Sequence, residues 1–353
     1  MRSRACLSFA LTLAAAAALP ACSDDDNDKL LDDAEYETKA VLTVKGFIEE
    51  NLDELAAAAI ALQAAAPAPD ADGWSAEADP AAVSAMKVEW KRARQAYEHV
   101  EGAIAVLFPD LDVATDARYD AFIEASPDAD LFDDLGVTGV HAIERILWSD
   151  AIPAPVVAFE SALPNYVPAA FPATEAEAAA FKTKLCERLV ADTKAMQEQF
   201  KGLALDAPAS YRGVIGSMRE QVEKIAKAAT GEEESRYAQY TLGDMRANVA
   251  AGLETYAAFQ TWVLTKGAEG EAADAAILAG FERLNEGYRK IGGDALPAVP
   301  EGWSSENPTP AQLETEFGRL FSLVEAESDE ASEGALVRVM LDSASLLGIE
   351  ELP

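Results

Sequence analysis

Alanine makes up about a fifth of this 353-residue chain, and the apolar residues among the alanines recur at three- and four-residue intervals. In the stretch 36–66, for example, Val41, Val44, Ile48 and Leu52 follow this spacing. Alanine has the highest helix propensity and a low preference for strands. No segment alternates between apolar and polar residues with period two for long, as a half-buried strand would. The sequence therefore predicts an all-α protein.

Breaks rich in proline and glycine divide the helical pattern into segments. The segments form two sets of about four helices, and the boundary between the sets falls near 202–209. We therefore predict two four-helix bundles in a two-lobed arrangement, one over 36–205 and the other over 206–353. The stretch after Pro109 is expected to be a polar loop, and one long helix is expected over about 233–266.

The charge balance is strongly acidic, with 62 Asp and Glu against 28 Lys and Arg and a formal net charge of −34. Such a surface repels phosphate backbones, so the sequence argues against a nucleic-acid partner. It favours a protein that attracts cations or cationic partners.

The N-terminal segment has the pattern of a bacterial lipoprotein signal. Arg2 and Arg4 precede an apolar stretch that is too short to span a membrane, and Leu-Pro-Ala-Cys at 19–22 resembles a lipobox. We predict that 1–21 is removed and that Cys22 carries the lipid. The alternative is an ordinary secretory signal with an incidental cysteine.

The residues that follow the lipobox are consistent with a membrane tether. The segment 22–35 is short and acidic, as expected for a solvated linker. Ser23 follows the cysteine where Asp would otherwise stand, which in a Gram-negative cell favours the outer membrane. The expected location is therefore the periplasmic side of the cell envelope, with anchoring through the lipid.

A histidine and a glutamate at helical spacing are the first candidate metal ligands. His141 and Glu144 are three residues apart in Gly-Val-His-Ala-Ile-Glu-Arg-Ile-Leu-Trp, so their side chains share one helix face. Helical bundles present paired metal ligands at this spacing. A surface His–Glu pair without function is the alternative reading of so short a motif.

A second pair, Glu98 and Glu101, has the same spacing on an earlier predicted helix. If the two helices face each other, four ligands meet in a bundle core. Burial of carboxylates without a cation costs several kcal/mol each, so we expect a metal or protonation to accompany it. The alternative is a solvated face on which Arg94 pairs with Glu98. His99 points to another side of the helix and is not expected to bind the metal.

Four stretches of the chain resemble the imelysin-like superfamily, specifically its EfeO/EfeM-type iron-uptake proteins. The resemblance covers about 38–345. The matching stretches are Ala-Arg-Gln-Ala-Tyr-Glu followed by Glu101, Asp-Ala-Arg-Tyr-Asp at 116–120, Gly139 to Trp148, and Thr-Gly-Glu-Glu at 230–233 with Arg236, Tyr237, Asp244 and Asn248.

The resemblance implies two four-helix bundles and a metal site near the His-x-x-Glu pair, with iron bound for delivery to an inner-membrane permease. By position, His141 and Glu144 are the leading ligands, Glu98 and Glu101 come next, and Asp116 is a possible fifth. Three further residues are expected beside the ligands without binding the metal: Arg118, Tyr97 and Asp120. Such donors suit iron and also zinc or another divalent ion.

The chain departs from the family in three respects. We expect it to lack the cupredoxin-like domain of the longer members and to carry a lipobox that the soluble members lack. Gln239 and Thr241 stand where many relatives have His and Asp. The last difference puts any second metal site at those two positions in doubt.

Two other functions stay open at this point. One is an interaction or scaffold lipoprotein whose metal site has decayed. The other is a metallopeptidase, because the superfamily has carried that label; the usual His-Glu-x-x-His helix is absent from the sequence.

Overall fold

The computed structural model describes residues 31–103 and 108–350, and every regular element in these ranges is helical. The prediction of an all-α protein is therefore confirmed. The helices are α1 (Asp33–Ala65), α2 (Pro80–Glu98), α4 (Pro109–Asp116), α5 (Tyr119–Ile123), α6 (Gly139–Leu147), α7 (Ala154–Glu160), α8 (Glu175–Ala180), the π-helical turn η1 (Phe181–Leu185), α9 (Cys186–Lys201), α10 (Ala207–Lys227), α11 (Thr241–Leu264), α12 (Ala268–Arg289), α13 (Pro310–Leu313), α14 (Glu316–Ser328) and α15 (Leu336–Leu347).

The expected signal 1–21 and Cys22 lie outside the described residues. Of the expected tether, 33–35 is already helical, because the side chain of Asp32 accepts a hydrogen bond from the Glu35 backbone and the side chain of Glu35 accepts one from the Asp32 backbone. This capping box satisfies free N–H groups at the start of α1. Within the described ranges, no helix is both long and apolar enough to cross a membrane.

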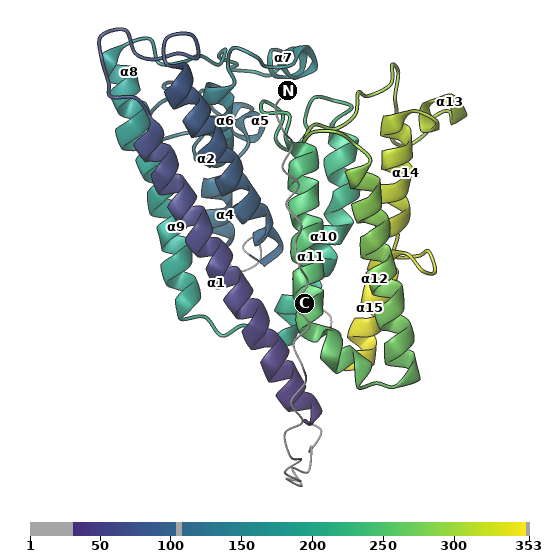
Figure 1. Ribbon diagram of the computed structural model, residues 1–353. Coiled ribbons are helices and arrows are strands. Elements are labelled where there is room, and N and C mark those ends of the chain that lie inside the picture. The colour runs from purple at the N-terminus through teal and green to yellow at the C-terminus, as the bar shows by residue number, and fades with distance from the viewer. Residues whose placement is uncertain (1–30, 104–107, 351–353) are drawn as a thin grey trace, which may run out of the picture.

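The helices form two groups that lie side by side. Figure 1 shows α1, α2, α6 and α9 in one group and α10, α11, α12, α14 and α15 in the other. The larger hydrophobic core includes side chains from both, for example Val44 and Leu55 of α1 with Phe259 of α11 and Met340 of α15. A smaller core holds α6 against α2 and α9, with Trp90, Ile143 and Leu189 fully buried. The N-terminal half of α1 thus shares a core with the second group.

The predicted polar loop after Pro109 is wrong, because this stretch forms the helices α4 and α5. Proline occupies the first turn of α4, where its missing N–H is not needed and its fixed φ suits the helix. Asp110 and Asp112 lie in the same turn and complement the helix dipole. These helix-start signals outweigh the polar composition of the stretch.

The predicted long helix over 233–266 is also wrong in its first part. Helix α11 begins only at Thr241, and the residues before it form turns. Gln239 has a φ of 52°, which is incompatible with a right-handed helix. The backbone N–H groups of Tyr237 and Ala238 donate to the Glu144 side chain, 2.9 and 2.8 Å away. Bonds to another helix therefore replace the bonds that would have extended α11.

Candidate metal centre

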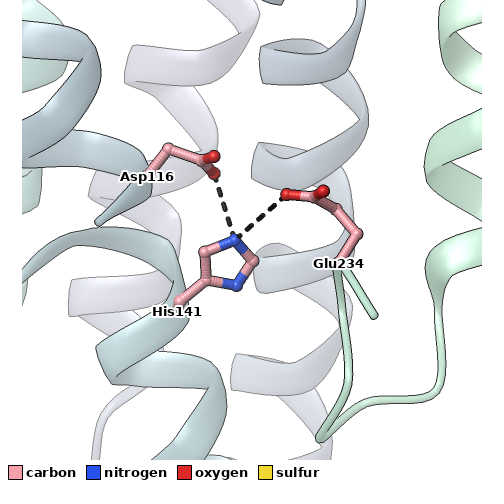
Figure 2. Close-up of side chains that lie close together, drawn as sticks. All are labelled: Asp116, His141 and Glu234. Carbon is pink, nitrogen blue, oxygen red and sulfur yellow. Dashed lines mark ion pairs between the residues drawn. The ribbon is translucent and has the colours of Figure 1, made fainter. Parts of the chain in front are cut away.

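Three side chains from separate parts of the chain converge at one point between the two helix groups. Asp116 ends α4, His141 lies on α6, and Glu234 lies in the turns before α11. The Nε2 atom of His141 is 3.2 Å from Oδ1 of Asp116 and 3.6 Å from Oε1 of Glu234, as Figure 2 shows. One ligand atom from each of the three residues lies within 4.8 Å of the other two. The spacing is compatible with a single metal ion.

A glycine allows α6 to approach α4 closely enough for this contact. Gly139 has a φ of 84°, and a Cβ at this position would lie 2.1 Å from the carbonyl oxygen of Thr115. Only glycine adopts this conformation at no steric cost. The indole N–H of Trp90 donates to the Val140 carbonyl at 2.8 Å and ties α6 to α2. The glycine that begins the His-x-x-Glu stretch thus brings His141 against Asp116.

Glu144 is fully buried and directs neither oxygen at the convergence point. Its Oε2 pairs with Nδ1 of His141 at 2.8 Å, and its Oε1 accepts the two backbone hydrogen bonds from Tyr237 and Ala238. Glu144 therefore holds the His141 ring on one side and the turns that carry Glu234 on the other. Metal-bound histidines commonly bond through their second nitrogen to such a carboxylate.

The buried guanidinium of Arg94 lies among four carboxylates. It pairs with Glu98 and Asp116, with Glu234 at 3.0 Å and with Asp244 at 3.4 Å. Arg94 is fully buried, so the alternative of a solvated Arg94–Glu98 pair is wrong. We expected a metal ion or protonation to accompany these buried carboxylates. The structure shows a third means of neutralising them, which is a cationic side chain of the protein itself.

Lys224 of α10 supplies a second buried cation. Its Nζ is 2.9 Å from Oε2 of Glu98 and 3.0 Å from Oε2 of Glu101. The amide of Asn248 also donates to Glu98, at 2.7 Å, and to Glu101, at 3.3 Å. The structure therefore brings Glu98 and Glu101 next to the group formed by Asp116, His141 and Glu234, and both glutamates form ion pairs with Lys224.

The charges around the site shift the pKa values of its members in opposite directions. Burial lowers the pKa of His141, but Asp116, Glu144 and Glu234 outweigh burial and raise it well above the usual value. Burial raises the pKa of Glu234, but Lys224, His141, Arg118 and Arg94 outweigh burial and hold it well below the usual value. Burial and the nearby Glu98 carboxylate raise the pKa of Glu101 to about 8. Without metal, a protonated His141 thus offsets the ionised Asp116 and Glu234.

A pocket of about 200 Å³ opens beside the ligand atoms. All of its lining residues carry charged side chains: Glu101, Asp116, Arg118, Glu220, Glu223, Lys224, Lys227 and Glu234. Five of the eight are acidic, so the pocket favours a small hydrated cation over an apolar ligand.

The remaining residues singled out in the sequence lie around the centre. Arg118 donates to the Glu232 carbonyl at 3.1 Å and pairs with Glu234. Asp120 pairs with Arg236 at 2.9 Å, and the hydroxyl of Tyr97 donates to Asp112.

His99, Gln239 and Thr241 make other contacts. His99 bonds to Asn51 of α1 at 2.8 Å. Gln239 donates to the Arg236 carbonyl at 2.9 Å, and the Thr241 hydroxyl accepts the Ser235 backbone N–H at 3.2 Å. Gln239 and Thr241 thus support the turns that carry Glu234.

Glu234 is the site residue that sequence reasoning missed. The helical pattern predicts that it lies inside a long helix, where one glutamate of the run Glu-Glu-Glu at 232–234 gives no sign of pointing inward. The stretch that resembles the family surrounds this position, and Gly231 breaks the helix just before it. Those two observations together could have indicated a turn with an inward carboxylate.

Comparison with known proteins agrees with the resemblance found in the sequence. The chain is similar to the iron uptake system component EfeO of Yersinia pseudotuberculosis, with 32% identity over 156 residues, which are 44% of this chain and 32% of the relative. It is also similar to EfeO of Escherichia coli K12, with 28% identity over 167 residues, which are 47% of this chain and 35% of the relative. The matched part thus spans about a third of the length of these curated relatives. The model of the imelysin family matches residues 48–316, most of the chain, and the chain therefore belongs to the imelysin family.

Proposed function

We propose that this chain is a cell-envelope protein of iron uptake that binds an iron ion at Asp116, His141 and Glu234. The observation that carries the proposal is the Nε2 atom of His141. It is buried, makes no hydrogen bond within the described part of the chain, and faces the carboxylates of Asp116 and Glu234. A metal ion at this point replaces the proton that this nitrogen carries in the metal-free protein, and neutralises the two carboxylates.

The donor set is suited to a transition metal. One imidazole nitrogen and two carboxylate oxygens suit iron, and also zinc or manganese. Iron is favoured because the similar EfeO proteins are named as iron uptake components. Three protein ligands leave coordination positions open, and the charged pocket beside them can supply water to fill these positions.

The surrounding residues have supporting roles in this proposal. Glu144, expected from sequence as a ligand, orients His141 and fixes the turns that carry Glu234. Glu98 and Glu101 lie beside the proposed ligands and form ion pairs with Lys224. Arg94 pairs with Asp116 and Glu234, so an arriving metal shares these carboxylates with a cation already in place.

The cellular setting and the division into lobes are part of the same proposal. A lipid on Cys22 keeps the protein at the membrane, on the periplasmic side and in the outer membrane, and the bound iron passes to an inner-membrane permease. The two lobes at 36–205 and 206–353 meet at the metal centre, since Asp116 and His141 come from the first and Glu234 from the second. A Cys22→Ser variant tests the anchor: it is expected in the soluble fraction or as uncleaved precursor, whereas a soluble, unlipidated wild type contradicts this part.

Calorimetric titration with ferrous ion under anaerobic conditions tests the metal site. The triple variant Asp116→Asn/His141→Ala/Glu234→Gln is expected to lose high-affinity binding. Glu223→Gln is the matched control, because it removes an acid from the same pocket that is not one of the three ligands. Equal binding by wild type and triple variant places the metal elsewhere on the acidic surface and favours a scaffold role.

A further inference from the structure

Lys224 lies where a second metal ion could otherwise bind. Among the described residues, two groups of three ligating side chains are close enough to hold an ion, and the second group consists of Glu98, Glu101 and Glu234. The Nζ atom of Lys224 is 2.9, 3.0 and 3.8 Å from an Oε2 atom of these three residues in turn. Its ammonium group therefore contacts all three carboxylates, as a bound cation would.

The first two carboxylates of this group are held in place by other residues as well. Glu98 pairs through Oε1 with Arg94 and accepts at Oε2 from the amide of Asn248. The carbonyl of that amide accepts from Gln221 at 3.0 Å, and Gln221 in turn accepts from the hydroxyl of Tyr288 at 2.9 Å. This chain of hydrogen bonds fixes the Asn248 side chain. The same amide also donates to Glu101 at 3.3 Å, so removal of the ammonium group alone leaves both carboxylates with a hydrogen-bond donor.

The two groups of ligands share Glu234 and divide its oxygens between them. Its Oε1 lies toward His141 and Arg94, whereas its Oε2 lies toward Lys224 and Arg118. A second divalent ion in the place of Lys224 would therefore be bridged through this carboxylate to an ion at His141.

We propose that Lys224 is a built-in cation that closes the Glu98–Glu101–Glu234 group to metal and limits the protein to one ion per chain. The ammonium group neutralises part of the acidic cluster with a single charge and repels a divalent ion from it. The inference deepens the proposed function, since it concerns the number of ions that the same cluster holds.

The experiment counts bound manganous ions, because three carboxylates form a set of hard oxygen donors that suits this ion. Wild type is expected to bind one Mn²⁺ per chain and Lys224→Met to bind two. The two ions share Glu234, so the electron paramagnetic resonance spectrum of loaded Lys224→Met should show exchange coupling that wild type lacks. Lys224→Arg keeps the charge and should bind one ion. The double variant Lys224→Met/Glu101→Gln also lacks one carboxylate ligand of the second group, so it should bind one Mn²⁺ per chain.

Two further measurements guard against a variant that fails to fold. Lys224→Gln keeps a hydrogen-bond donor toward the same carboxylates and is expected to bind the second ion as well. In wild type, reductive methylation followed by mass spectrometry should leave Lys224 unmodified both with and without Mn²⁺. Methylation of Lys224 on metal loading would show that the metal displaces it, and would overturn the proposal.

The number of Mn²⁺ ions bound by each Lys224 variant is compared with the number bound by the same protein with Lys224 intact. This comparison separates the inference about Lys224 from the proposed site at His141. In a His141→Ala background the first ion is expected to be lost, and Lys224→Met should still add one. If wild type binds no metal at His141 but Lys224→Met gains an ion, the proposed site fails and this inference stands. If wild type binds two ions, or if neither Lys224→Met nor Lys224→Gln gains one, Lys224 does not close the group.

Discussion

The Nδ1 atom of His141 lies 2.8 Å from Oε2 of Glu144, so the two residues of the His-x-x-Glu pair bond to each other. The i,i+3 spacing brings them together on one helix face, as the sequence predicted. The contact leaves Nε2 of His141 as the atom that faces Asp116 and Glu234. The pair thus presents one oriented imidazole with a carboxylate behind it.

This relationship predicts different effects for two substitutions of Glu144. In Glu144→Gln, the side-chain oxygen can still accept from Tyr237 and Ala238, but the charge behind His141 is lost; we expect metal affinity to fall about 10- to 100-fold with a small loss of stability. Glu144→Ala also leaves the buried N–H of Tyr237 and the half-buried N–H of Ala238 without this partner, which adds roughly 1–3 kcal/mol of destabilisation for the buried group and less for the other. Titration calorimetry and thermal unfolding measure the two effects. Unchanged affinity in both variants would contradict the orienting role.

The two histidines that follow the signal segment are expected to differ sharply. His141→Ala removes the only nitrogen donor of the proposed site, and we expect at least a ~10-fold loss of affinity for ferrous ion. His99→Ala is the control, because His99 contacts Asn51 of α1 and belongs to neither group of ligating side chains among the described residues. Equal losses in both variants would point to a global effect on the fold.

Glu234 is expected to matter as much as His141, although it lies in a turn. Glu234→Gln keeps the shape of the side chain and removes its charge, so binding of ferrous ion should weaken by at least ~10-fold. Glu223→Gln removes one charge from the same pocket at an exposed position and should change the affinity little. Wild-type affinity in Glu234→Gln would exclude this carboxylate as a ligand.

Gly139 is predicted to be essential for placing His141. Gly139→Ala introduces a Cβ against the Thr115 carbonyl at a positive φ, so we expect destabilisation by about 1–3 kcal/mol together with weaker metal binding. Gly46→Ala is the matched control. Gly46 lies inside α1, and a Cβ added there would meet nothing within 4 Å beyond its own helix, so alanine should stabilise by about 0.5–1 kcal/mol. The two variants are compared by thermal unfolding.

The raised pKa of His141 predicts how pH affects metal binding and stability. In the metal-free protein, the protonated His141 contributes stability that is complete below about pH 6.5 and is lost as the pH rises through its folded pKa. A metal ion needs the neutral imidazole, so it must displace this proton. The rise in melting temperature on adding ferrous ion should therefore grow as the pH rises from about 6.5 toward the raised folded pKa of His141, and depend less on pH in His141→Ala. The same pH dependence in both proteins would place the titrating group elsewhere.

Local sequence was sufficient to predict the class of the fold and the pairing of His141 with Glu144. Alanine content and helical spacing predict helices because both depend only on residues within a turn or two of each other. The same short range explains why His141 and Glu144 could be paired. The prediction that Glu98 and Glu101 share one helix is wrong, because α2 ends at Glu98; Lys224 and Asn248 hold the two carboxylates together instead. Residues such as Pro109, read as part of a polar break, begin helices because their fixed φ suits the first turn.

The tertiary structure alone decided which charges meet. Glu234 reaches His141 because Glu144 accepts hydrogen bonds from the backbone of Tyr237 and Ala238 and prevents α11 from extending through them. Lys224 reaches Glu98 across 126 positions of the sequence. Contacts at such separations depend on how the helices pack, and no local pattern encodes them. The sequence therefore determined which residues could bind a cation, and the packing of the two helix groups determined which of them face the proposed ion and which are neutralised by the protein's own arginine and lysine.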